Sequence, residues 1–218
     1  MSRRTEKRPQ TIVYIDGFNF YYGAVKGTPH KWLDFEALCQ GMLPRDRLIK
    51  IRYFTSRVSA RSDDPQKPVR QDTYLRALAT LPLVEIHFGH FVTRTERWPR
   101  ADRRQGESRT VKIRRTEEKG SDVNLATYLL LDAFQGRCDT AAVISNDSDL
   151  AQAIDVAQSQ LGIKVGVVNP HPRERRSREL LGLDCLFYKQ VPRQLLAQTQ
   201  LPLVVHGSKG PIRKPNSW

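Results

Sequence analysis

The amino-acid sequence predicts an α/β protein built on a mostly parallel central sheet. Short apolar runs rich in β-branched residues recur along the chain, helical patterns lie between them, and 39% of the 218 residues are hydrophobic. Uninterrupted apolar runs are typical of strands that are buried on both faces. Strands that alternate with helices are typical of parallel sheets covered by helices, and this hydrophobic content suffices for a packed core.

Five segments are expected to form strands. The first covers residues 11–15 and ends sharply at Asp16, after a polar and basic N-terminal tail at residues 1–10. Each of the others is a short apolar or β-branched run, at residues 49–54, 83–88, 140–145 and 164–168.

Four segments between these strands are expected to be helices, at residues 34–42, 69–81, 121–134 and 149–161. The last two are followed by Gly136 and Gly162. Glycine often closes a helix because it adopts the left-handed conformation without a steric cost.

No repeat or long linker divides the chain, so we expect one domain at residues 11–191, followed by a C-terminal extension at 192–218. A basic insertion at about 94–118 interrupts the alternation. Between residues 94 and 119 there are ten basic and five acidic residues, which predicts a long loop or hairpin before the next helix.

The net charge indicates a polyanionic partner. The chain has 36 Lys and Arg residues against 23 Asp and Glu residues, a formal net charge of +13. Nucleic acid is the usual partner of such a protein. A membrane partner is not expected, because no basic amphipathic helix is evident.

The sequence favours a cytoplasmic protein. The first apolar run is interrupted by Asp16 and Asn19, unlike a secretory signal, and no run reaches the roughly 18 apolar residues of a membrane span. Its three cysteines, Cys39, Cys138 and Cys185, form no C-x-x-C pair, which argues against a zinc ribbon or a disulfide framework.

Four aspartates are candidate catalytic residues and metal ligands. Asp16 and Asp147 follow predicted strands, Asp122 begins a predicted helix, and Asp149 lies two residues after Asp147. Residues just past the carboxyl ends of neighbouring parallel strands converge on one crevice. Clustered carboxylates repel one another unless a cation is bound, and oxygen ligands suit Mg²⁺ or Mn²⁺. Metal-assisted hydrolysis of a phosphodiester would join this acidic site to a basic surface.

Each aspartate also has a simpler interpretation. Asp122 and Asp149 are placed to complement a helix dipole, and Asp147 to cap a helix. Asp16 is harder to explain in this way, because no helical pattern follows Gly17.

Three further residues are supporting candidates. Ser145 and Ser148 flank Asp147 and would orient a metal-bound water, although Ser148 is equally suited to cap a helix. Lys119 precedes Asp122 by three residues and either holds a phosphate or is an ordinary solvated charge.

Four segments, YIDGFN, EEKGSDVNLATYLLLDAF, DTAAVISNDSDL and VGVVNPHP, resemble the NYN domain family, the LabA-like branch of the PIN-like nucleases. The resemblance covers residues 11–188. It implies a three-layer α/β/α PIN-like, Rossmann-like sandwich and Mg²⁺- or Mn²⁺-dependent cleavage of RNA. The implied catalytic carboxylates are Asp16, Asp122, Asp147 and Asp149.

Two residues qualify this resemblance. Asn19 matches the asparagine of the first family motif and by analogy orients Asp16 or contacts a phosphate, although asparagine is also a common turn residue. Tyr128 stands where many relatives carry an acidic residue, so a fifth carboxylate is missing.

The basic insertion is the expected RNA-binding element, and the expected partner is single-stranded or structured RNA. Basic side chains there would contact phosphates, namely Arg103, Arg104, Arg114 and Arg115. Trp98 would stack on an unpaired base. The oligomeric state stays open, with a homodimer as one option.

Two functions remain: a metal-dependent endoribonuclease, and an RNA-binding regulatory module with a PIN-like fold and little or no catalysis. Four intact carboxylates favour the enzyme, because a pure binder gains nothing from negative charge that faces phosphates. A haloacid dehalogenase-type phosphatase would need aspartate where this chain has Phe18. There is no P-loop motif, and no histidine pair has the spacing of a helical zinc site.

Overall fold

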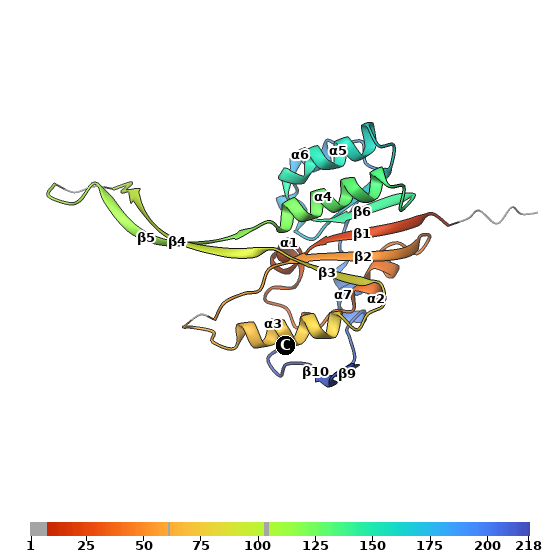
Figure 1. Cartoon of the computed structure of the whole chain (residues 1–218), viewed down its shortest axis with the longest axis horizontal. Helices are drawn as coiled ribbons and strands as arrows, with labels where there is room; N and C mark the ends of the chain where they lie inside the picture. The colour runs from red at the N-terminus through yellow and green to blue at the C-terminus, as the bar shows by residue number, and fades with distance from the viewer. Residues whose placement is uncertain (1–7, 61, 103–104) are drawn as a thin grey trace, which may run out of the picture.

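The computed structural model describes residues 8–60, 62–102 and 105–218, so residues 1–7 of the predicted basic tail lie outside the description. Figure 1 shows a central sheet between two layers of helices, with a long hairpin extending away from this body. The predicted α/β class and the three-layer PIN-like sandwich are both confirmed.

The central sheet has six parallel strands in the order β3-β2-β1-β6-β7-β8. Its strands are β1 (Gln10–Asp16), β2 (Arg47–Thr55), β3 (Val84–Phe88), β6 (Thr140–Ile144), β7 (Lys164–Asn169) and β8 (Phe187–Gln190). All five predicted strands are confirmed. The sixth, β8, was not predicted, because four residues at a sheet edge carry little pattern.

Helices cover both faces of the sheet (Figure 1). On one face lie α4 (Ser121–Phe134), α5 (Ala151–Ser159) and α6 (Arg178–Leu181). On the other lie α2 (Phe35–Met42), α3 (Lys67–Leu78) and α7 (Arg193–Gln198). Alternate residues of β1 enter the two cores, Val13 and Ile15 on one side and Ile12 and Tyr14 on the other. Burial of both faces explains the unbroken apolar run.

The helix ends mostly follow the predicted signals. Helix α4 has the predicted bounds, and Gly136 and Gly162 adopt φ values of 60° and 68°. Helix α5 is preceded by a 3₁₀ turn, η2 (Ser148–Leu150), and another short turn, η3 (Arg173–Arg175), follows β7. Helix α3 begins at Lys67, two residues earlier than predicted, with a proline in its first turn.

The prediction that no helix follows Gly17 was wrong. A short helix, α1 (Gly17–Phe20), continues into a π-helical turn, η1 (Tyr21–Val25). Asp16 caps α1, because its Oδ1 accepts a hydrogen bond of 2.9 Å from the backbone N of Asn19. Gly17 is required by close packing, since a Cβ there would lie 2.6 Å from the carbonyl oxygen of Phe54.

The basic insertion was predicted to be a long loop or a hairpin, and the structure shows a hairpin. Its strands, β4 (His90–Pro99) and β5 (Thr110–Lys119), pair with each other in a separate two-stranded sheet between β3 and α4. The hairpin projects far beyond the sandwich in Figure 1.

The C-terminal extension packs into the domain. Its hairpin, β9 (Val204–Gly207) with β10 (Gly210–Arg213), contacts α3. The backbone N of Leu201 donates to the carbonyl oxygen of Trp32, and the final residue, Trp218, packs edge-on against Trp32 and Tyr74. Within the described part of the chain, no helix has the length and apolar character needed to cross a membrane.

Candidate active site

The strand order reverses between β1 and β6, and a cleft of about 520 Å³ opens beside their carboxyl ends. Such a reversal point is where open α/β sheets bind ligands. Four carboxylates line this acidic cleft: Asp16, Asp122, Asp147 and Glu118. The other side chains used below that line it are Phe18, Asn19, Tyr22, Val58, Lys67, Phe91, Thr93, Thr116, Ser121 and His171.

Four different elements bring the carboxylates together. Asp16 ends β1 and Asp147 follows β6, and these strands pair in register up to Ile15 opposite Ile144. Asp122 lies in the first turn of α4, which begins after Gly120 at a φ of 90°. Glu118 lies near the end of β5. The predicted convergence of Asp16, Asp122 and Asp147 on one crevice therefore agrees with the observed arrangement.

Ser145 connects two of these aspartates. Its buried hydroxyl donates a hydrogen bond of 3.0 Å to Oδ2 of Asp16 and accepts one of 3.1 Å from the backbone N of Asp147. Because Asn19 donates to the other oxygen of Asp16, that carboxylate is held at both oxygens. Ser145 therefore orients the carboxylate of Asp16 and the backbone that carries Asp147.

Asn19 stabilises the loop after β6 by a hydrogen bond. Its Oδ1 accepts a hydrogen bond of 2.9 Å from the backbone N of Asn146, while its own backbone N reaches Asp16. Asn146 in turn donates to the carbonyl oxygen of Arg175. The side chain of Asn19 thus holds two loops together beside the cleft.

The carboxylates of the cleft repel one another. Burial raises the pKa of Asp16 to about 6; hydrogen bonds from Asn19 and Ser145 oppose this rise, and the charges of Asp122 and Asp147 add to it. Burial also raises the pKa of Asp147, and the nearby carboxylates contribute. A divalent cation would relieve this repulsion, and carboxylate oxygens are the ligands that Mg²⁺ and Mn²⁺ prefer.

The cleft differs from a dedicated protein cage for a metal ion. Across residues 8–60, 62–102 and 105–218, no three His, Cys, Asp or Glu side chains are grouped tightly enough to hold a metal ion by themselves. Magnesium is commonly bound by one or two carboxylates together with water and substrate phosphates. Asp16 and Asp147, with Asp122 close by, fit that mode of binding.

Four of the predicted catalytic and supporting residues are absent from the lining of the cleft: Ser145, which is buried, and Ser148, Asp149 and Lys119. Asp149 and Ser148 are exposed, and the backbone N of Asp149 donates to Oδ1 of Asp147. Asp147 is thus the cap of η2, as its simpler interpretation proposed. Burial is the main reason why the pKa of Asp147 is raised. The charge of the nearby Asp149 carboxylate adds a smaller contribution.

Lys119 also points away from the cleft. Its Nζ lies 2.9 Å from Oε2 of Glu117, so it belongs to a solvated ion pair. Lys67, at the start of α3, is a basic residue that lines the cleft instead. No signal in the sequence distinguished Lys67 from its exposed neighbours.

Glu118 was missed as a site residue. Its Oε1 accepts from the hydroxyl of Ser56 at 2.6 Å, and its Oε2 accepts from the hydroxyl of Ser121 at 2.7 Å. Side chains alternate between the two faces of a strand, so Glu118 lies on the cleft face of β5 while its neighbours Glu117 and Lys119 lie on the opposite face. A prediction of β5 as a strand would have identified it.

Tyr128 lies away from the acidic cleft. Its ring packs against the guanidinium of Arg52 at 4.5 Å and against His87 at 4.2 Å. Arg52 also forms a buried ion pair with Asp132, at 2.7 Å from Nε to Oδ2. The position of the missing fifth acid therefore belongs to this buried cluster.

The two faces of the β4–β5 hairpin differ in charge pairing. The cleft face carries Phe91, Thr93, Thr95 and Arg97, opposite Glu118, Thr116, Arg114 and Lys112. Phe91 packs edge-on against Phe18, and residues near the base of this face line the cleft. In the described part of the chain, its basic side chains Arg97, Lys112 and Arg114 are exposed and form no ion pair.

The outer face holds two of the predicted RNA-binding residues. Arg115 forms an ion pair with Glu117 and lies 5.2 Å from the ring centre of Trp98. The indole of Trp98 also donates to Glu96. Arg114 is on the cleft face, so the structure separates it from Arg115 and Trp98. Arg103 and Arg104 lie outside the described residues.

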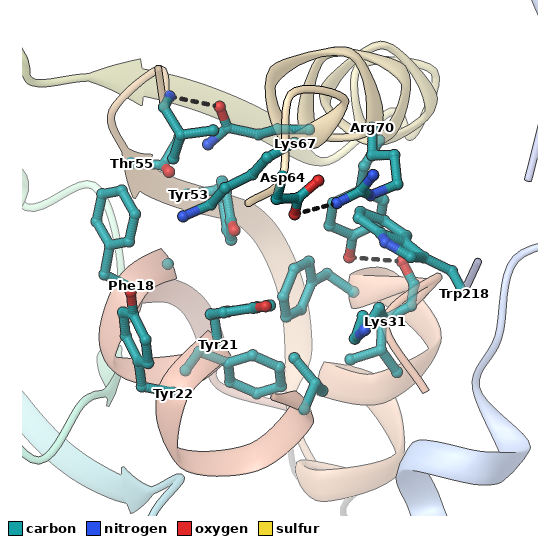
Figure 2. A pocket seen from close by; sticks show the side chains of 18 residues that line it. Phe18, Tyr21, Tyr22, Lys31, Tyr53, Thr55, Asp64, Lys67, Arg70 and Trp218 are labelled. Carbon is teal, nitrogen blue, oxygen red and sulfur yellow. Dashed lines mark hydrogen bonds and ion pairs between the residues drawn. The ribbon is translucent and has the colours of Figure 1, made fainter. Parts of the chain in front are cut away.

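A second cavity of about 190 Å³, the aromatic pocket, adjoins the cleft (Figure 2). Phe18 and Tyr22 stand at one end of the view and Trp218 at the other, with Tyr21 between them. Four residues line both cavities: Phe18, Tyr22, Val58 and Lys67. The remaining side chains used below are Lys31, Tyr53, Asp64, Arg70 and Gln71.

Comparisons with known proteins agree with this fold. The model of the NYN domain family matches residues 10–182. The chain is 32% identical, over 245 aligned residues, to 6-hydroxy-3-succinoylpyridine 3-monooxygenase HspA of Pseudomonas putida, an alignment that covers all of this chain and 78% of the relative. It also superimposes on the crystal structure of a protein of unknown function from Vibrio parahaemolyticus, with a TM-score of 0.55, 15% identity and coverage of 91% of this chain and 99% of the other.

Proposed function

The chain belongs to the NYN domain family and has a nuclease-like fold, and from this premise we propose that it is a metal-dependent endoribonuclease. The observation that carries the proposal is the acidic cleft, where Asp16, Asp122 and Asp147 converge at the reversal point of the sheet. The unpaired basic residues on the cleft face of the hairpin supply the matching surface for a phosphate backbone.

The residues of the cleft have distinct roles in this proposal. Asp16 and Asp147, oriented through Ser145, would hold the divalent cation together with Asp122. A bound Mg²⁺ or Mn²⁺ would supply charge neutralisation at the phosphate and a water of lowered pKa. Lys67, which lines the cleft, would bind a substrate phosphate, and Glu118 accepts a hydrogen bond from Ser121 at the start of α4.

The deciding experiment incubates the purified protein with RNA and DNA in Mg²⁺, Mn²⁺ or chelator. We expect metal-dependent cleavage of RNA, and its loss in Asp16→Asn, Asp122→Asn and Asp147→Asn, because each variant loses a ligating charge and keeps its shape. Full activity in all three variants would contradict the site. RNA binding without cleavage under every metal condition would support a regulatory module.

The chemistry of the cut ends tests the mechanism separately. If water attacks the phosphorus and the 3′-oxygen leaves, the products carry 3′-hydroxyl and 5′-phosphate ends. A 2′-O-methyl group at the cleaved position should then be tolerated. Cyclic 2′,3′-phosphate ends that persist in chelator would point to catalysis by a histidine such as His171 and against the aspartates.

The Pseudomonas relative suggests a second candidate function. Its name describes a monooxygenase that acts on 6-hydroxy-3-succinoylpyridine, a heteroaromatic ring with a carboxylate side chain. The aromatic pocket, with Lys31 and Lys67 in its lining, matches such a compound in chemical character. The test supplies this compound with NADH and measures oxygen uptake. Uptake that depends on the compound would favour this activity over hydrolysis.

A further inference from the structure

Apart from Lys67, the side chains that line the aromatic pocket have no role in the proposed hydrolysis. Aromatic rings from five parts of the chain line the pocket: α1 with η1, α2 (Phe35), β2 (Tyr53), α3 (Tyr74) and the C-terminus (Trp218). Figure 2 labels five of these rings: Phe18, Tyr21, Tyr22, Tyr53 and Trp218. The volume of the pocket is about 190 Å³. A protein cavity of about 150 Å³ holds a benzene molecule, so this larger pocket accommodates a flat aromatic group.

The charges in the pocket select for an anion. Arg70 is neutralised by an ion pair with Asp64. Lys31 and Lys67 also line the pocket, and across the described residues neither forms an ion pair. Aromatic walls with two uncompensated ammonium groups fit a flat ring that carries an anionic group.

The pocket and the acidic cleft form a continuous surface. Phe18, Tyr22 and Lys67 line both cavities, so Lys67 lies at the junction between them. We propose that the aromatic pocket receives the base of the nucleotide next to the cleaved phosphate, while Lys67 binds the phosphate at the junction. This inference rests on the proposed function and names the substrate unit that the second cavity takes.

The pocket is built to recognise the face of a base more than its edge. Gln71, a side chain with both donor and acceptor groups, is already occupied: its Oε1 accepts from the backbone N of Val58 at 2.8 Å and its Nε2 donates to the carbonyl oxygen of Ser56 at 2.9 Å. Stacking on aromatic side chains tolerates any base. We therefore expect all four bases to bind.

The first test measures binding to the full chain by calorimetry in chelator, where hydrolysis cannot interfere. The ligands are the four 5′-nucleoside monophosphates, ribose 5-phosphate, inorganic phosphate and nicotinate. All four nucleotides should bind more tightly than ribose 5-phosphate. Tyr22→Leu removes a half-exposed ring and should weaken nucleotide binding between about fivefold and about 150-fold, the range that stacking of one base supplies.

Two lysine variants provide a matched pair. Lys67→Gln should weaken the binding of nucleotides and of ribose 5-phosphate alike, because it removes a phosphate contact. Lys164→Gln is the control, since Lys164 is exposed at the start of β7, at the opposite end of the strands from the cleft. Equal effects of the two substitutions would overturn the placement of the phosphate.

The second test moves a single abasic nucleotide along an RNA oligomer. Cleavage, or binding if no cleavage occurs, should fall at one position at a constant distance from the cut. Equal binding of ribose 5-phosphate and the nucleotides, or an abasic scan without a minimum, would overturn the inference. Binding of nicotinate without any nucleotide would also overturn it and would assign the pocket to a small aromatic acid.

These measurements separate the two proposals. RNA cleavage with no nucleotide binding and a flat abasic scan would leave the nuclease intact and remove the base pocket. Nucleotide binding lost in Tyr22→Leu, together with RNA that is never cut, would keep the pocket and remove the nuclease.

Discussion

Asp16 combines a structural and a chemical role in one carboxylate. It caps α1 and also faces the acidic cleft. Because Asn19 and Ser145 already occupy its two oxygens, burial and not a lack of partners accounts for most of its raised pKa. Keeping the ionised carboxylate of Asp16 buried therefore lowers the stability of the folded state.

This cost predicts that the metal-free Asp16→Asn protein gains stability relative to the wild type as the pH rises. Below pH 3.8 the carboxyl is protonated in both states, and as pH rises the unfolded chain ionises first. The cost therefore grows from pH 3.8 to about 6 and is constant above it. At about 1.4 kcal/mol per pKa unit, it reaches about 3 kcal/mol.

Urea unfolding in chelator at pH 4 and at pH 8 checks this prediction. The stability of Asp16→Asn relative to the wild type should be higher at pH 8 than at pH 4 by most of this cost, because the hydrogen bond lost at the amide nitrogen contributes equally at both pH values. Adding Mg²⁺ to the wild type should reduce the difference, because a cation offsets the repulsion. An equal difference at both pH values would contradict the raised pKa.

Asp132 is the second residue whose charge has a calculable effect. Burial is the largest single influence and raises its pKa, but hydrogen bonds from Arg52, Tyr14 and Arg137, together with the charge of Arg52, lower the pKa overall. Asp132→Ala would leave Arg52 buried without this partner, so we expect a loss of about 3–5 kcal/mol in unfolding free energy. Glu85→Ala removes the exposed partner of the same arginine and should cost less than about 1 kcal/mol. Equal losses from the two changes would contradict this account.

The sequence could identify the carboxylates at strand ends but not those placed by an unpredicted strand. Asp16 and Asp147 follow apolar runs, and their convergence follows from the parallel sheet alone. Glu117 and Glu118 are neighbouring acidic residues, and only the alternation of β5 directs Glu118 to the cleft and Glu117 outward. That alternation is hidden because both faces of the hairpin are polar.

At the level of elements, prediction succeeded where burial is complete. Four of the five predicted strands, β1, β2, β6 and β7, and helix α4 carry strong apolar patterns because both faces, or one wide face, are covered. The fifth, β3, lies at the sheet edge and is at most partly buried. Elements α1, α6 and β8 were not predicted. Each has four residues, which are too few to show a periodic pattern of apolar side chains. The start of α3 was placed two residues late because Lys67 and its proline resemble a loop.

The β4–β5 hairpin yields a prediction that depends on its two faces. Replacing Arg97 and Arg114 with Gln removes from the cleft face two charges that have no ion pair among the described residues. Replacing Arg94 and Arg115 removes two arginines from the outer face of the same strands. If RNA lies along the cleft face, only the first change should weaken binding strongly. Each lost phosphate contact should also flatten the slope of log affinity against log salt by about 0.7 for a single strand.

Fluorescence anisotropy with a labelled RNA at several salt concentrations gives both quantities. The two double variants differ from the wild type by the same charge, so a general electrostatic effect would change them equally. Equal slopes for the two variants would mean that the RNA does not follow the cleft face. A larger effect from the outer pair would assign binding to Arg115 and Trp98 instead.

At the level of the whole molecule, the C-terminal extension belongs to the core. Leu201 is 6% exposed, whereas Leu203, two residues later, is 73% exposed. We therefore expect Leu201→Ala to lower the unfolding free energy by about 2–5 kcal/mol, as for other buried leucines. Leu203→Ala should change it by less than about 0.5 kcal/mol. Equal thermal shifts in the two variants would mean that the extension does not stabilise the domain.

The strand order could not be derived from the sequence, although the parallel class could. Alternating strands and helices predict parallel pairing but leave several orders open. The observed order requires a crossover from β3 at one edge to β6 beside β1, and the hairpin and α4 both lie in that connection. Long insertions there are compatible with the fold because they leave every strand pair intact.

The regular register of the hairpin also allows its outer part to be removed by protein engineering. Residues pair one to one from His90 opposite Lys119 to Pro99 opposite Thr110, and the hydroxyls of Thr93 and Thr116 lie 2.9 Å apart near the base. Excising residues 94–115 and closing the arm with an Asn-Gly turn would keep the lower rungs of this ladder and the lining of the cleft. The shortened protein would be a minimal scaffold onto which arms of other lengths or charges can be grafted as interchangeable modules.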